Sequence, residues 1–591
     1  MSHRLAPPLA RPLVLAAALA CTACAGPGAP PALSPAEAAG WTLHGHDLGA
    51  QRHSPLADID ARNVAKLVSK WTYHSGVVGT FQATPIVVGE TMVLSLPYSS
   101  VVALDAATGR ERWRYTHRAR PGPLCCGPAS RGVAVAGGKV YVGSVDGRLL
   151  ALDAADGRVL WDVTVADYGP NRTESTAQLQ PGDPLSQVGA TGSTGVGIGA
   201  APLVHAGRVY IGINGVGYGL HPDQGLAVVG VSGKYGRPGL MAAFDAENGR
   251  PVWRFDITGP GWEGEFRAAT PDGVPLQRDL TAEHAAAAAQ AEAWRYGGGS
   301  VYATPAIDPA RRLLIFGSGN PSPQMADASR PGDNLYTSSL IALDLDSGRR
   351  VWHYQQVPHD RWGYDVASPP VLLEVKRGGR RVAAVAQASK LGWVYVHERE
   401  TGRLLFKSDA FVPQRNLFTP PQPGEGVVVA PGIAGGANWS PSAYDPERAL
   451  FFVGALHLPT RYVAHRVTRP DGSVLDYAST RNVDESWGTL SAIDMAHEGA
   501  IVWQVRTDEP LIGGVLATAG GLVFSGAGGG RLAAFDSASG ERLWEARCEA
   551  GVNAPPVTYA VGGRQYVAVA AGGNALFGFR QGDAVVAFGL P

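Results

Sequence analysis

Two adjacent cysteines, Cys125 and Cys126, form the pair whose type and spacing point most directly to chemistry. A disulfide between chain neighbours closes a distorted eight-membered ring that presents a rigid, flat and polarisable surface, and such a bond persists in an oxidising compartment. The alternative is two ordinary buried thiols, because free cysteine is among the most buried residue types. Both interpretations remain open from these two residues alone.

Several familiar catalytic motifs are absent from the sequence. No Cys-x-x-Cys-His motif occurs, which excludes covalently attached haem of the c type. There is no P-loop, no G-x-S-x-G elbow and no H-E-x-x-H. The glycine-rich run 192–199 leads into Ala201-Pro202 and a predicted strand, so it does not match a dinucleotide-binding fingerprint, which opens a helix.

The N-terminus has the anatomy of an export signal. Arg4 and Arg11 precede the apolar run 13–20, which is too short to cross a bilayer as a helix. Small residues follow at 21–26, so we expect residues 1–25 to be a signal peptide of the lipoprotein type, with Cys24 or Cys21 acylated. Ordinary cleavage at Ala23-Cys24-Ala25 is the alternative. Residues 26–40 are predicted to be a flexible tether, and the mature chain is predicted to be periplasmic.

Composition favours a large all-β protein and argues against nucleic acid as a partner. The chain has 591 residues, with 50 basic and 51 acidic side chains, so it lacks the positive charge on which nucleic-acid binding draws. It contains 77 Gly and 44 Pro, which helices tolerate poorly but many short strands joined by tight turns require. Residues 41–591 are therefore predicted to form one closed β-structure.

A repeated turn defines the predicted architecture. In each copy an alternating apolar strand reaches an Asp or Glu, a Gly follows, and the next strand carries an aromatic residue. The copies run from Asp105 to Trp113, Asp153 to Trp161, Asp245 to Trp253, Asp344 to Trp352, Glu398 to Phe406, Asp494 to Trp503 and Asp536 to Trp544, and Trp71 supplies an eighth aromatic residue. We expect the acid to cap the turn, Gly to take a left-handed conformation and the aromatic ring to enter the space between sheets.

One such sheet cannot bury both of its faces, whereas a ring of sheets can. The spacing of the copies suits four-stranded blades, and eight aromatic turns favour an eight-bladed β-propeller with tryptophan-docking repeats. An array of β-sandwiches is the alternative. The longer gaps between copies are predicted to be loop insertions, and the alanine-rich stretch 282–294 is predicted to be a short helix within one of them.

The chain resembles the quinoprotein alcohol dehydrogenases, exported eight-bladed propellers that use pyrroloquinoline quinone (PQQ). The resemblance covers about residues 41–591. Its marks are RHSPL at 52–56, Cys125-Cys126 with Arg131, GGGS at 297–300, GSGNP at 317–321, RPGDN at 330–334, PHDRW at 358–362 and GGVLATAG at 513–520. The C-terminal AGGN at 571–574 and the segment 582–591 are more similar to the membrane glucose dehydrogenases.

The resemblance implies a set of cofactor contacts. In the family the quinone lies between the vicinal disulfide, here Cys125-Cys126, and an aromatic ring, here Tyr302 in place of the usual Trp. Arg131 and Ser300 match positions near the cofactor carboxylates, and Gln82 stands where alcohol-specific relatives often carry Glu. Lys390 matches the cation beside the quinone oxygens, and Asn438 with Trp439 matches a further contact. For each residue the alternative is a polar or aromatic group that serves the propeller loops.

The resemblance also implies a Ca²⁺ or lanthanide ion, but two expected ligand positions differ. The usual metal-binding Glu aligns with Gly217, and the usual catalytic Asp, directly after Trp362, aligns with Gly363. Asn320 stands at the position of the asparagine that binds the ion in the family. Asp365 is predicted to replace the catalytic base and to bind the metal with Asn320, because residues two apart on an extended segment share a face and Gly363 would leave room. Asp333 is predicted to be structural.

Two functions follow from these observations. The first is a periplasmic PQQ-dependent dehydrogenase that oxidises an alcohol, polyol or sugar and passes electrons to a separate acceptor such as cytochrome c, since the chain carries no haem motif. The second is a catalytically degenerate quinoprotein-like propeller that acts as a binding or scaffold lipoprotein. The cysteine pair and Lys390 favour the first, and the glycines at 217 and 363 favour the second.

Overall fold

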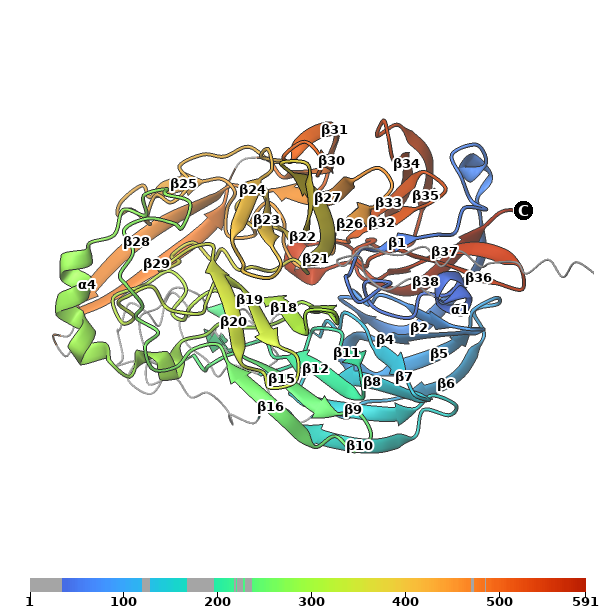
Figure 1. The fold of residues 1–591 in the computed structure, drawn as a ribbon, viewed down its shortest axis with the longest axis horizontal. Helices are drawn as coiled ribbons and strands as arrows, with labels where there is room; N and C mark the ends of the chain where they lie inside the picture. The colour runs from blue at the N-terminus through green and yellow to red at the C-terminus, as the bar shows by residue number, and fades with distance from the viewer. Residues whose placement is uncertain are drawn as a thin grey trace, which may run out of the picture.

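The computed structural model describes residues 34–119, 128–166, 196–216, 219–220, 227–228, 236–468, 472, 474–483 and 485–591. Within these residues the chain folds almost entirely into antiparallel sheets, arranged around a common centre in Figure 1. Helical structure is confined to short pieces. These are α1 (Pro35–Ala39), α4 (Leu280–Ala287) and the 3₁₀ turns η1 (Val64–Lys66), η2 (Pro97–Ser99), η3 (Ala288–Gln290), η4 (Ala293–Tyr296) and η5 (Ala575–Phe577).

The first four sheets in chain order have four strands each and a simple meander or near-meander order. Their strands are β3 (Ile86–Val88), β4 (Thr91–Ser95), β5 (Val101–Asp105) and β6 (Glu111–Tyr115); β7 (Ala134–Ala136), β8 (Lys139–Gly143), β9 (Arg148–Asp153) and β10 (Val159–Thr164); β11 (Leu203–His205), β12 (Arg208–Gly212), β15 (Leu240–Asp245) and β16 (Pro251–Asp256); and β17 (Ala306–Asp308), β18 (Leu313–Gly317), β19 (Ser339–Asp344) and β20 (Arg350–Gln355).

The next sheets continue the same plan. Their strands are β21 (Val371–Arg377), β22 (Arg380–Ala388), β23 (Val394–Glu398) and β24 (Leu404–Lys407); β26 (Ala443–Asp445), β27 (Leu450–His457), β30 (Trp487–Asp494) and β31 (Ala500–Thr507); and β32 (Val515–Thr518), β33 (Leu522–Gly526), β34 (Arg531–Asp536) and β35 (Arg542–Arg547), to which β1 (His53–Ser54) adds a parallel edge. The first strands of neighbouring sheets contact one another, as β3 with β7 and β21 with β26, so they form the inner ring.

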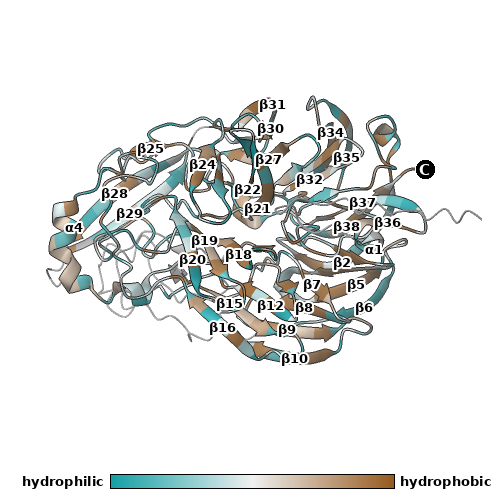
Figure 2. Ribbon diagram, viewed as in Figure 1, coloured by the Kyte–Doolittle hydropathy of each residue, from teal (hydrophilic) through white to brown (hydrophobic). Residues whose placement is uncertain are grey.

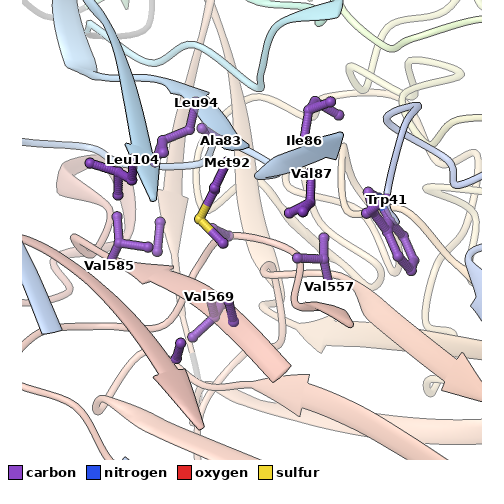
Figure 3. Close-up of a cluster of buried hydrophobic side chains, with 14 of the residues drawn as sticks. Trp41, Ala83, Ile86, Val87, Met92, Leu94, Leu104, Val557, Val569 and Val585 are labelled. Carbon is purple, nitrogen blue, oxygen red and sulfur yellow. The ribbon is translucent and has the colours of Figure 1, made fainter. Parts of the chain in front are cut away.

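The two ends of the described chain share one sheet. The long strand β2 (Val68–Gly79) pairs antiparallel with β38 (Gly582–Gly589), which continues through β37 (Arg564–Ala571) to β36 (Val557–Val561). The core between this sheet and the β3–β6 sheet is apolar, with Met92 and Leu104 packed toward Val569 and Val585 (Figure 3). β2 therefore closes the circle against the C-terminal strands.

Smaller elements lie outside these sheets. They are the pair β13 (Gly219–Leu220) and β14 (Ala227–Val228), and the sheet of β25 (Val427–Val429), β28 (Thr460–Thr468) and β29 (Val474–Asn482). The β28–β29 hairpin projects on the same side as α4 and is more hydrophilic than the strands of the central sheets (Figure 2). The predicted helix at 282–294 corresponds to α4 with η3 and η4. No helix in the described part of the chain is long and apolar enough to span a membrane.

The repeated turn joins most sheets to the next. In the first copy, Asp105 accepts the backbone N–H of Thr108 and Gly109 has φ +72°. The indole of Trp71, from the preceding sheet, lies over Gly109 and donates Nε1–H to the carbonyl of Ala106 at 3.2 Å. Four other indoles donate Nε1–H to a backbone carbonyl in the same way: Trp113 to Ala154, Trp253 to Leu345, Trp352 to Arg399 and Trp503 to Ser537. Trp544 donates to Leu67, just before β2, across the closure.

The close approach of indole to glycine predicts a stability difference between two substitutions. Gly109 and Gly76 share a φ of +72°, but an added Cβ lies 2.5 Å from Trp71 Cε3 at Gly109 and meets nothing within 4 Å at Gly76. We expect Gly76→Ala to lower the free energy of unfolding by about 1–2 kcal/mol from the left-handed conformation alone. Gly109→Ala is expected to cost about 1–3 kcal/mol more from overpacking.

Chemical or thermal unfolding of the two single variants beside the wild type measures this difference. Equal losses would contradict it, because both positions carry the same backbone strain.

Candidate functional site

The candidate site residues come from equivalent places in different sheets. Each lies in the segment that leads into the first strand of its sheet, and these first strands make up the inner ring. They are Gln82 before β3, Arg131 before β7, Tyr302 before β17, Asp365 before β21, Trp439 before β26, Ile512 before β32 and Asn553 before β36. The architecture thus gathers residues that are distant in sequence at the centre of the molecule.

Asp365 is the centre of a buried cluster. The residue is 2 % exposed. Tyr302 donates its hydroxyl to Oδ2 at 2.5 Å, and the backbone N–H of Asn320 donates to Oδ1 at 2.8 Å. Lys390 Nζ lies 3.7 Å from Oδ2 and donates to the carbonyl oxygens of Gly363 at 2.7 Å and Ile433 at 3.2 Å. A carboxylate, a phenol and an ammonium group therefore meet in one place.

The turn that leads to Asp365 is shaped by a second buried carboxyl group. Asp360 accepts the backbone N–H groups of Trp362, Gly363 and Tyr364, and also the hydroxyl of Ser338. Burial, with the neighbouring negative charge of Asp365, raises the pKa of Asp360 from 3.8 to about 6. This group therefore binds a proton more tightly in the folded chain than in the unfolded one.

This raised pKa predicts a pH dependence of stability. The stability that Asp360 contributes by holding its proton is fully present below the unfolded pKa of about 3.8 and is lost as pH rises through about 6. We expect Asp360→Asn to gain free energy of unfolding relative to the wild type as pH rises from about 4 to about 7. Denaturant unfolding at several pH values measures this difference, and a constant difference across the range would contradict the prediction.

The space beside Gly363, which was predicted to leave room for Asp365, holds the end of the Gln324 side chain. A Cβ at Gly363 would lie 1.8 Å from Gln324 Nε2, and Gly363 has φ +84°. Gln324 is 3 % exposed, and its Oε1 has no hydrogen-bond partner among the described residues. Gln324 thus occupies the place where a side chain at position 363 would begin.

A small cavity lies next to this cluster and is lined in part by Arg131. The Arg131 guanidinium stacks over the rings of Tyr302 and Trp439, at 5.5 and 5.2 Å, and donates to the Tyr302 carbonyl at 3.0 Å. The cavity is lined by His44, Gln82, Arg131, Ala303, Thr304, Pro369, Trp439, Pro441, Ile512, Gly513, Asn553 and Pro555. Arg131 therefore connects the Asp365 cluster with the cavity.

The cavity has unpaired polar atoms that suit an anionic, planar cofactor. Gln82 Oε1, Trp439 Nε1 and both side-chain atoms of Asn553 are buried without hydrogen-bond partners in the described part of the chain. Such atoms cost free energy unless a ligand or water satisfies them. Burial, with the positive charges of Arg52 and Arg131, lowers the pKa of His44 to about 3, so its imidazole is neutral at physiological pH. A cationic guanidinium, an indole and amides match the carboxylates and rings of PQQ in chemistry. The cavity itself has a volume of only about 10 Å³, room for about one water molecule, so the side chains that line it would have to move apart to admit PQQ.

The remaining predicted cofactor contacts lie apart from the cavity lining. Ser300 is buried, and its carbonyl accepts the N–H of Gly319 at 2.7 Å. Asn438 donates to the carbonyl of Ala434 at 2.8 Å and accepts the N–H of Trp439 at 2.9 Å, so its amide shapes this loop.

Cys125, Cys126 and Gly217 lie outside the described residues. Cys548 is a free cysteine, and burial raises the pKa of its thiol to about 11.

The predicted metal site does not assemble from the residues that the structure describes. In that part of the chain no group of three or more His, Cys, Asp or Glu side chains is placed to hold an ion. Asn320 donates its amide group to the carbonyl of Pro321 at 2.7 Å, and both oxygens of Asp365 already accept hydrogen bonds. The donors described here do not fit a Ca²⁺ ion, which takes six to eight oxygen ligands.

Asp333 has the structural role predicted for it. Its carboxylate accepts the N–H groups of Glu265 and Arg267 and pairs with Arg278 at 2.6 Å, with both side chains buried. Sequence reasoning missed Gln324, His44, Thr304 and Asn553. Thr304 and Asn553 lie just before β17 and β36, so their place ahead of a first strand is a signal that could have found them.

Comparison with known proteins places this arrangement in context. The family model "PQQ: Glucose/ethanol/alcohol dehydrogenase, beta-propeller domain" matches residues 41–416 and 467–567. The quinoprotein alcohol dehydrogenase PedH of Pseudomonas putida is 31 % identical over 93 % of this chain and 90 % of its own length. The quinohemoprotein alcohol dehydrogenase ADH-IIG of Pseudomonas putida is 34 % identical over 92 % of this chain and 73 % of its own length.

Solved structures show the same fold. The structure of the quinohemoprotein alcohol dehydrogenase ADHIIG from Pseudomonas putida HK5 superposes with a TM-score of 0.74 and 30 % identity, covering 94 % of this chain and 80 % of that one. A europium-containing methanol dehydrogenase superposes with a TM-score of 0.75 over 94 % of this chain and 99 % of its own. Because the identity is 24 %, the second comparison supports only the all-β propeller fold.

Proposed function

This chain belongs to the PQQ-dependent glucose, ethanol and alcohol dehydrogenase family, and from that premise we propose that it is an exported dehydrogenase that oxidises an alcohol, polyol or sugar. The observation that carries the proposal is the buried meeting of Asp365, Tyr302 and Lys390 beside the cavity lined by Gln82, Arg131 and Trp439. A scaffold protein has no need of a carboxylate, a phenol and an ammonium group buried together.

The described residues supply distinct parts of the chemistry. Asp365 is the group to take the proton of the substrate hydroxyl, because it is the carboxylate of the cluster that lies beside the cavity. Tyr302 and the Asn320 N–H fix the carboxylate by donating to its two oxygens. Lys390 compensates the buried negative charge, and Arg131 with Trp439 would hold the cofactor. PQQ, when bound, supplies the two-electron acceptor for the hydride of the alcohol carbon.

Several finer assignments are part of the same proposal. The sheets described above are proposed to be eight blades, locked by the tryptophan contacts between neighbours. The anatomy of residues 1–25 supports export to the periplasm, with Cys24 or Cys21 as a candidate lipid anchor. Cys125 and Cys126 are proposed to form the vicinal disulfide that covers one face of the quinone. The electron acceptor is proposed to be a separate protein such as a cytochrome c, since this sequence has no haem motif.

Two measurements on the purified protein test the proposal. PQQ is titrated with tryptophan fluorescence as the readout, and the loaded protein is then assayed against primary alcohols, polyols and aldoses with an artificial dye as electron acceptor. Stoichiometric quenching followed by substrate-dependent dye reduction is expected. Quenching without turnover on any of these substrates would favour the degenerate binding protein, and absence of quenching would exclude a quinoprotein function.

A further inference from the structure

We infer that this chain binds its quinone without the metal ion that the family resemblance implies, with Lys390 supplying the positive charge and Gln324 occupying the place of a missing carboxylate side chain. The inference rests on the proposed function, because it concerns the same quinone site. Three features of the described residues carry it: the hydrogen bonds of Asp365, the space beside Gly363 and the buried cation beside Asp365.

The first feature is that protein groups already donate a hydrogen bond to each oxygen of Asp365. Asp365 Oδ1 accepts the Asn320 N–H, and Oδ2 accepts the Tyr302 hydroxyl at 2.5 Å. An ion bound to Asp365 would have to displace the phenol or share an oxygen with it. A tyrosine hydroxyl is neutral, so it stabilises the carboxylate without adding charge.

The second feature is that Gln324 fills the space beside Gly363. Its Nε2 lies where a Cβ at position 363 would be, and its Oε1 is buried without a partner among the described residues. The backbone carbonyl of Gln324 accepts Arg330 Nη2 at 3.0 Å, which holds this loop in place. A neutral amide therefore stands where a carboxylate side chain would have to enter.

The third feature is that Asp365 already has a buried cationic partner. Lys390 Nζ lies 3.7 Å from Asp365 Oδ2, with both side chains nearly inaccessible to solvent. Lys390 thus supplies one positive charge to Asp365, and a divalent or trivalent ion bound to the same carboxylate would add further positive charge beside this ammonium group.

The test is a titration of PQQ into the full-length mature protein, stripped of metal with EDTA, in three buffers containing EDTA, CaCl₂ or LaCl₃. Tryptophan quenching gives the Kd. We expect the three Kd values to agree within about twofold. A tenfold or greater tightening by either ion would overturn the inference while leaving the proposed function intact. Absence of quenching in all three buffers would overturn the proposed function, and the inference with it.

Two variants test the assigned residues separately. Lys390→Met is expected to weaken PQQ binding in EDTA by tenfold or more, whereas Lys376→Met, at an exposed position on β21, is expected to leave it unchanged. Gln324→Glu adds a carboxylate oxygen with almost no change in shape. We expect its PQQ binding to weaken in EDTA and to recover at least tenfold with Ca²⁺ or La³⁺.

Each variant has an outcome that counts against its residue. If Lys390→Met binds PQQ as tightly as the wild type, Lys390 does not supply the positive charge at the quinone site. A Gln324→Glu variant with no response to either ion would show that Gln324 does not occupy a ligand position. Melting temperatures identify a variant that fails to fold, and the ion dependence of the wild type still decides the inference in that case.

Discussion

Replacement of Asp365 by Asn is expected to lower kcat/KM for alcohol oxidation by about 10²–10⁴, the usual contribution of a positioned general base. The amide keeps the shape of the carboxylate, and its oxygen can still accept the Asn320 N–H. The amide group cannot take up the proton of the substrate hydroxyl. PQQ binding, measured by fluorescence quenching, is expected to stay within about threefold of the wild-type value, because the cavity lining does not include Asp365.

Two further variants distinguish the loss of the base itself from changes in the groups around it. Tyr302→Phe keeps the ring beneath Arg131 and removes the hydroxyl that donates to Asp365, so a smaller loss and an altered pH profile of kcat are expected. Asp256→Asn, at an exposed position on β16, is expected to leave activity unchanged. Activity of Asp365→Asn within about threefold of wild type would assign the base to another residue.

The second large effect concerns stability. Arg330 is completely buried and donates to four acceptors: the carbonyl oxygens of Pro323, Gln324 and Asp360, and the Asn334 side chain. Arg330→Met removes the donors and leaves these acceptors buried. We expect the free energy of unfolding to fall by about 3–5 kcal/mol, because each buried acceptor left without a donor costs about 1–3 kcal/mol and the loop can relax to satisfy some of them.

Denaturant or thermal unfolding measures the loss, and Arg349→Met at an exposed position provides the control, with an expected change within about 0.5 kcal/mol. Because Arg330 holds the loop of Gln324 and the turn of Asp360, the variant is also expected to weaken PQQ binding. A stability close to that of wild type would mean that the loop rearranges to satisfy its carbonyl groups elsewhere.

The repeats could be predicted from the sequence because each unit is local. The acid, the glycine and the aromatic residue of one turn lie within about ten residues, and their chemistry fixes the turn wherever it occurs. The all-β propeller followed from that pattern and from the composition. The docking partner of each indole was not local, since Trp71 lies over Gly109 of the next sheet, and the pattern indicated only that the ring enters the space between sheets.

The site was harder to predict because its contacts depend on distant segments. The resemblance identified Asp365, Lys390 and Tyr302, and the structure brings them together. It could not give the hydrogen bond from Tyr302 to Asp365, since the tryptophan usual in relatives has no hydroxyl. The contact between Gln324 and Gly363 could be found only from the structure, because neither local sequence indicates it.

The pairing of β2 with β38 determines when the native ring can form. β2 begins at Val68 and its partner ends at Gly589, so the sheet joins segments from opposite ends of the chain. Contacts of such sequence separation slow folding, because the loop between them must lose its entropy before the pairing stabilises anything. Until β38 pairs, the chain therefore has an open edge on β37, and deletion of residues 582–589 would leave that edge available to another molecule.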